Sequence, residues 1–218
     1  MRLSPLVALS GAVMALLGIL TGEMLALLSY ASATLLALSG LLALEERRIS
    51  SRELALLAAL STLSAASRIP FAALPSVQPC TFIIEVSGAT LGPAMGFFVG
   101  ILTPLISNLA LGMGPWLPWQ MMAWGLLGWL AGILFRGWSR SLPAFGLLSG
   151  YLYGAITNLS MLFLYYPATL HSLALLELYS LPFDTAHAVG NLLFFAALGP
   201  RFSRALLRYK ARSEFRGL

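Results

Sequence analysis

The sequence predicts an all-α integral membrane protein of about eight spans, in which a six-helix bundle follows an N-terminal transmembrane hairpin. Hydrophobic residues make up 59% of the 218 residues and charged residues only 10%. The mean hydropathy is +0.86. A water-soluble fold of this length could not bury so many apolar residues. Glycine, proline and charged residues divide this composition into apolar runs long enough to cross a bilayer.

The first two runs, residues 5–20 and 24–44, are separated only by Thr21, Gly22 and Glu23. A signal peptide is the alternative, but no small-residue cleavage site follows the first run and the second begins almost at once. We therefore expect a transmembrane hairpin over residues 1–44, ended by a charged cluster at 45–48.

A third span is expected over residues 52–67, the first helix of a domain that covers 45–204. Ser50 or Ser51 can cap it, with Glu53 in its first turn. Its small residues fall four apart in two series, so another helix backbone can approach closely; they are Ala55 and Ala59, and Ala58, Thr62 and Ala66. The spacing leaves open whether that partner is internal or a second protein.

A proline-rich loop, residues 68–79, is followed by a short apolar segment at 80–91 that contains Glu85. Gly92 and Pro93 then turn the chain into a span that reaches Leu111. Glycines recur every fourth residue across this turn, which predicts tight packing on neighbouring helices; they are Gly88, Gly92, Gly96 and Gly100.

The stretch 108–124, NLALGMGPWLPWQMMAW, is a second proline-containing loop between two apolar runs. Pro118 suits the first position of the next helix, which places Trp119 and Gln120 in its first turn. Membrane tryptophans often anchor a helix at the interface, and that is one interpretation of Trp116, Trp119 and Trp124. The other is a lid over a binding site that faces outside.

Two further spans are expected at 119–135 and 143–164, the second with a stripe of small residues that ends in an amide: Gly146, Gly150, Gly154 and Asn158. Residues 165–183 are interpreted as a long connection. Asp184 can cap the last span, which runs to Leu198 and is ended by Gly199 and Pro200. A basic tail at 205–218 suits a helix against anionic lipid.

The charges orient this arrangement. With the N-terminus in the cytoplasm and eight spans, twelve of the thirteen basic residues fall inside and only Arg68 outside. The positive-inside rule therefore predicts a protein of the cytoplasmic membrane with both termini in the cytoplasm. The rule places the two proline-containing loops, at 68–79 and within 108–124, on the external side together with the connection at 165–183.

Polar residues within the apolar chain are few, and they are costly in hydrocarbon unless they meet one another or a ligand. Asp184, His187 and Asn191 share one face of the last span. The candidate substrate-binding residues are Arg68, Gln78, Asn108, Trp116, Trp119, Gln120, Asn158, Asp184, His187 and Asn191. Several have simpler explanations: Asp184 as a helix cap, Asn158 and Asn191 as interhelical contacts, and His187 as a packed ring.

A pocket of aromatic rings with a few amides, one arginine and one histidine suits a flat, uncharged or weakly charged heterocycle. The lack of a basic cluster outside argues against a polyphosphorylated substrate. The chain has no glycine-rich segment ending in GK, so no Walker-type loop is present in the sequence. Its one cysteine and two histidines predict no disulfide framework, metal site or catalytic residue.

The block 52–133, with RIPFAALPSVQP, GATLGPAMGFFVG and SNLALGMGPWLPWQMMAWGLLG, resembles the substrate-binding membrane subunits (S components) of energy-coupling factor (ECF) vitamin importers. The resemblance covers about residues 52–204. It implies a six-helix fold whose outward pocket is roofed by the loops after its first, third and fifth helices, here 68–79, 112–118 and 165–183.

The same resemblance implies the partners. In that family an Ala-x-x-x-Ala motif, matched by Ala55 and Ala59, docks onto a transmembrane coupling subunit, and two ATPases supply the energy. The chain itself would bind no cofactor, ATP being used by the partner ATPase subunits. The extra hairpin departs from the family plan and leaves the docking geometry open.

We therefore expect a transport subunit that captures a vitamin or related small molecule outside the cell. It is expected to lie in the lipid bilayer and to bind no nucleic acid. The main rival is a stand-alone proton-coupled carrier that uses Glu85, Asp184 or His187 as its proton site. A membrane enzyme is disfavoured because His171, His187 and Cys80 lack ligand or nucleophile spacing.

Overall fold

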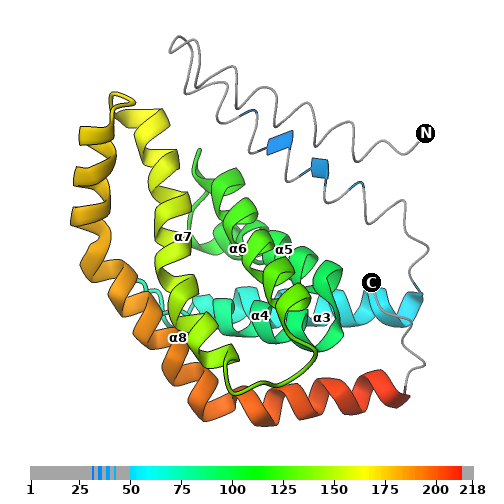
Figure 1. The fold of residues 1–218 in the computed structure, drawn as a ribbon. Coiled ribbons are helices and arrows are strands. Elements are labelled where there is room, and N and C mark those ends of the chain that lie inside the picture. The colour runs from blue at the N-terminus through cyan, green and yellow to red at the C-terminus, as the bar shows by residue number, and fades with distance from the viewer. Residues whose placement is uncertain (1–30, 32–33, 36–37, 40–41, 43–49, 213–218) are drawn as a thin grey trace.

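The computed structural model describes residues 50–212 and six helical positions between 31 and 42. The hairpin predicted for residues 1–44 otherwise lies outside the described residues. The described chain is all-helical, without a strand (Figure 1). Its helices are α3 (Ser51–Arg68), α4 (Cys80–Leu91), α5 (Pro93–Leu111), α6 (Leu117–Leu134), α7 (Leu142–Tyr165) and α8 (Leu170–Arg212).

The sequence pattern predicted the ends of α3 to α7 to within two residues. Ser50 caps α3 as expected, in a capping box in which its side chain accepts from the backbone of Glu53 and the Glu53 carboxylate accepts from the Ser50 backbone. Pro118 lies in the first turn of α6, where a missing N–H costs nothing. Among the described helices, α5 to α8 are the four that are long and apolar enough to cross a membrane.

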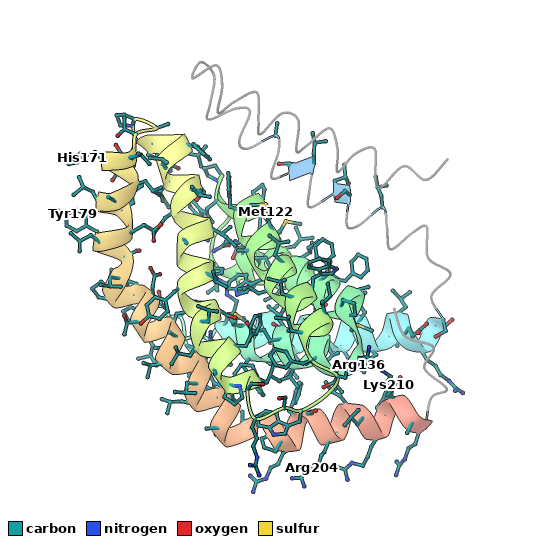
Figure 2. All side chains as sticks on the ribbon, in the orientation of Figure 1. Met122, Arg136, His171, Tyr179, Arg204 and Lys210 are labelled. Atoms are coloured by element: carbon teal, nitrogen blue, oxygen red, sulfur yellow. The ribbon has the colours of Figure 1, made fainter. Side chains whose placement is uncertain are left out.

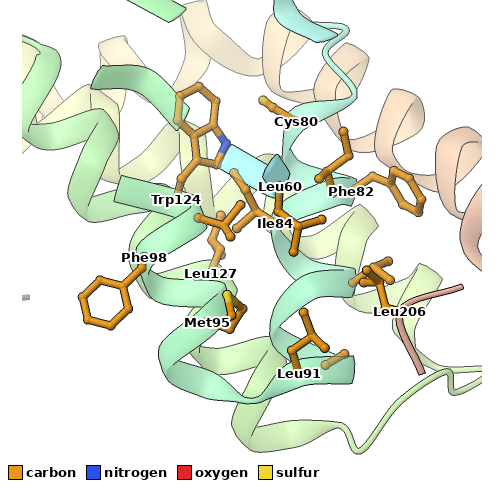
Figure 3. Close-up of a cluster of buried hydrophobic side chains, with 14 of the residues drawn as sticks. Leu60, Cys80, Phe82, Ile84, Leu91, Met95, Phe98, Trp124, Leu127 and Leu206 are labelled. Carbon is orange, nitrogen blue, oxygen red and sulfur yellow. The ribbon is translucent and has the colours of Figure 1, made fainter. Parts of the chain in front are cut away.

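The short helix α4 is the centre of the bundle. All twelve of its residues are buried, and it contacts each of the other five described helices. Figure 3 shows its side chains Phe82, Ile84 and Leu91 among those of α3, α5, α6 and α8, including Leu60, Met95, Leu127 and Leu206. This burial explains why α4 carries apolar side chains on every side rather than on one face.

Glycines let α4, α5 and α6 touch backbone to backbone, as their fourfold spacing predicted. A Cβ at Gly96 would collide with the carbonyl of Gly128 and with the Cα of Gly88. The second stripe serves α7 and α8 in the same way: a Cβ at Gly150 would collide with Ala188, and one at Gly146 with the ring of Phe195.

The long connection predicted for residues 165–183 is wrong. Only residues 166–169 separate α7 from α8. The Thr169 hydroxyl accepts a hydrogen bond from the Ser172 backbone at the start of α8, and the strong helix formers that follow extend the helix. Pro182 therefore lies inside α8, and Asp184 is not the predicted cap but an interior residue.

The end predicted for the last span at Gly199 and Pro200 is also wrong, because α8 continues to Arg212. Figure 1 shows that α8 changes direction along its length rather than stopping. Proline removes one hydrogen bond and bends a helix without necessarily ending it. Gly199 has a packing role here, since a Cβ at that position would collide with the Trp138 ring.

Basic side chains gather at one end of the described bundle. Figure 2 shows Arg136, Arg204 and Lys210 at the end opposite His171. Hydrogen bonds join the segments there: Tyr209 donates to the carbonyl of Arg52 and Lys210 to that of Thr90. Arg68 lies apart, at the last residue of α3.

Candidate functional site

Five of the ten predicted site residues belong to one buried polar network. Arg68 donates from Nε to Gln78 over 2.8 Å and from Nη1 to Asn108 over 3.0 Å. Asn108 in turn donates to Gln120 over 2.8 Å, and Gln120 donates to the hydroxyl of Tyr153. Side chains from α3, α5, α6 and α7 and from the loop before α4 are thereby tied together.

Aromatic rings form the other half of this network. The guanidinium carbon of Arg68 lies 4.7 Å from the ring centroid of Trp124, and Tyr153 stacks on Trp124 at 4.5 Å. The Trp124 indole donates to the Thr81 hydroxyl, which lies 2.8 Å from Nε2 of His187. The fifth predicted residue, His187, thus joins the network from α8.

The helix ends explain why these residues meet. Arg68 is the last residue of α3, and Thr81 lies in the first turn of α4. Asn108 lies in the last turn of α5, and Gln120 in the first turn of α6. The loops 69–79 and 112–116 therefore cover the same end of the bundle, as the sequence predicted.

Asn158 and Asp184 form a separate cluster between α7 and α8. Asn158 donates to the Ser180 hydroxyl over 2.8 Å, and Ser180 donates to the Asp184 carboxylate over 2.6 Å. Gly154 leaves room for that carboxylate, since a Cβ there would collide with it. The bond from Asn158 to Ser180 joins α7 to α8, and such an interhelical hydrogen bond is worth about 1 kcal/mol.

The remaining three predicted residues lie outside both clusters. Asn191 is fully buried and donates to the backbone carbonyl of Gly146, an interhelical contact. Trp116 is half-buried at the residue before α6. Trp119 is buried with its ring 5.9 Å from that of Phe163, and its indole N–H has no partner among the described residues.

Four members of the network were not predicted as site residues: Thr81, Ser107, Trp124 and Tyr153. Trp124 belongs to the tryptophan-rich stretch, so its residue type was a signal. Ser107 is adjacent to Asn108 and accepts from Arg68. Thr81 and Tyr153 carry no sequence signal, because a threonine and a tyrosine in apolar helices are common and only the fold brings them to Trp124.

The two alanines predicted to dock a partner lie on an exposed face of α3. Ala55 and Ala59 are exposed together with Ala58, Thr62 and Ala66. The opposite face, with Leu56, Leu57 and Leu60, is buried in the core. The small-residue stripe of α3 is thus directed away from the other described helices.

These features define a multi-pass helical membrane protein with a buried polar and aromatic cluster at one end of its bundle. Residues 53–209 match the family described as ECF transporter, substrate-specific component. The chain belongs to this family, as the sequence resemblance indicated. Comparison with curated proteins and with solved structures gives no significant match.

Membership fixes the general role of the chain. It is a substrate-specific subunit of an ECF transporter, a substrate-binding membrane protein rather than an enzyme. The family implies a small-molecule substrate and partner ECF subunits.

Proposed function

We propose that this chain captures a vitamin or related small molecule on the external side of the cytoplasmic membrane and delivers it to an ATP-driven importer. The observation that carries the proposal is the polar and aromatic network around Arg68. Polar side chains are rarely brought together in an apolar bundle unless they serve one another or a ligand. Here six helices and one loop contribute to a single cluster under two loops.

The distribution of charge supports the orientation. Arg52, Arg136 and the basic residues of α8 meet at the end of the bundle opposite the loops 69–79 and 112–116. Positive charge marks the cytoplasmic ends of membrane helices. The network and its two loops then face outside, where an importer receives its substrate, and the C-terminus lies in the cytoplasm.

The exposed alanine face of α3 supports a docking role. Small side chains let a second helix approach closely in a membrane. Ala55 and Ala59 are the proposed contact with a transmembrane coupling subunit, which two ATPase subunits drive. In this scheme the chain holds no cofactor of its own and the partners use the ATP.

Purification from a host grown in rich medium tests the proposal, with bound small molecules identified by mass spectrometry. We expect a vitamin-like compound with the parent chain and its loss from Gln120→Ala, because Gln120 joins Asn108 to Tyr153. Trp119→Ala tests the neighbouring aromatic residue, and Arg136→Gln is the matched control, since Arg136 is exposed at the opposite end. A parent chain without any bound compound, also unresponsive to a thermal-shift screen of vitamins, would contradict it.

A further inference from the structure

The side chain of Arg68 is buried but has only neutral partners. It is 5% exposed. Its hydrogen bonds go to the amide oxygens of Gln78 and Asn108 and to the Ser107 hydroxyl. The Trp124 ring completes the contacts of the guanidinium.

No carboxylate neutralises this cation within the described part of the chain. Glu53 lies at the other end of α3, paired with Ser50. Asp184 accepts from Ser180, and Glu85 is buried without a hydrogen-bond partner. None of them forms an ion pair with Arg68.

An arginine stays charged under all physiological conditions. A buried charge is tolerated in an apolar bundle only when it forms an ion pair or takes part in binding or transport. Neutral amides and a ring face offset part of the cost, but they leave the net charge in place. In addition, Nη2 makes no hydrogen bond to any described residue, although a guanidinium fork commonly binds two oxygens of one carboxylate.

We propose that Arg68 receives a carboxylate of the substrate, so that the transported molecule is a monocarboxylate rather than a neutral or cationic compound. This inference rests on the proposed function. A single negative charge matches the single cation of the network, whereas a phosphate would bring excess charge. The histidine of the network, His187, is engaged through Nε2 with Thr81.

Thermal unfolding of the purified full chain with a matched pair of probes tests the proposal. Benzoate and benzamide have the same ring and nearly the same shape, and they differ in charge. We expect benzoate to raise the Tm of the parent more than benzamide does, and Arg68→Gln to abolish the difference. Arg136→Gln should behave as the parent, and Arg68→Lys, which keeps the charge, should retain part of the effect.

The co-purified compound gives the second measurement. We expect it to carry one carboxylate and to bind Arg68→Gln roughly 100-fold or more weakly, the order expected when one partner of a buried charge pair is removed. Equal Tm shifts with the two probes, or a neutral compound retained by Arg68→Gln, would overturn the inference and leave the proposed function standing. A parent chain that binds neither a co-purified compound nor a vitamin would overturn both.

Discussion

The Thr81 hydroxyl connects two rings that belong to different helices. It accepts from the Trp124 indole of α6 over 2.9 Å and lies 2.8 Å from Nε2 of His187 in α8. Tyr153 contacts both rings, stacked on Trp124 and edge-on to His187 at 5.0 Å. One small side chain therefore fixes the aromatic half of the network.

Replacing Thr81 by valine should keep its shape and leave two buried ring nitrogens without their partner. We expect a loss of roughly 1–3 kcal/mol for each orphaned group, together with weaker substrate binding. Chemical unfolding in detergent and ligand titration measure the two effects. Thr157→Val is the control, because the Thr157 hydroxyl bonds only to carbonyls of its own helix; equal losses in both variants would contradict this role for Thr81.

Glu85 distinguishes a binding subunit from a proton-coupled carrier. It is fully buried in α4, and neither carboxyl oxygen has a hydrogen-bond partner among the described residues. If the chain is a binding subunit, Glu85→Gln should retain substrate binding and partner-dependent uptake, because no described contact needs the charge. Uptake that proceeds without any ATPase partner and is abolished by Glu85→Gln would instead identify a proton-coupled carrier.

At the scale of single residues, the sequence identified the costly polar groups but not all of their partners. Arg68, Gln78, Asn108 and Gln120 were predictable because an apolar chain has few such side chains. Asp184 was interpreted as the cap of the last span, whereas it lies inside α8 and accepts from Ser180. Its position depends on the length of the helix, which the local pattern misjudged.

At the scale of helices, the contact between α5 and α6 depends on glycine. A Cβ at Gly128 would collide with the carbonyl of Gly96. Gly128→Ala must therefore separate two backbones, and we expect a destabilisation of about 1–3 kcal/mol from overpacking. Gly125→Ala on the same helix meets only side-chain atoms of Phe97 and Ile101 and should cost less; the reverse order in a thermal or chemical unfolding series would refute this packing.

The exposed face of α3 gives the second prediction at this scale. Ala59→Trp adds a large side chain to a face that contacts no other described helix. We expect the variant to bind substrate as the parent does and to fail to co-purify with the coupling subunit. Leu109→Trp, at an exposed position of α5, is the control, and a normal complex with Ala59→Trp would place the docking surface elsewhere.

Helix boundaries were predictable where glycine or proline coincides with a cap or a turn. Gly92, with φ 120°, ends α4 and Pro93 begins α5, as the sequence indicated. Pro182 and Pro200 have no such turn, and α8 continues through both of them. A sequence pattern cannot separate these cases, because tertiary contacts decide whether the helix resumes.

At the scale of the molecule, the connectivity brings together the helix ends that carry Arg68, Thr81, Asn108 and Gln120. The bundle alternates direction, so the loops after α3 and α5 lie together and basic residues collect at the opposite end. Composition and charge predicted this polarity. The central position of α4 was not predictable, because a short apolar segment of twelve residues fits an interfacial piece equally well.

Native mass spectrometry of the purified chain tests the central claim most directly. The account predicts that one small molecule of constant mass accompanies each parent chain and that Asn108→Ala, which breaks the link from Arg68 to Gln120, loses it while remaining folded. A parent chain that carries only lipid or detergent, or an Asn108→Ala variant with the same compound at the same occupancy, would contradict the account.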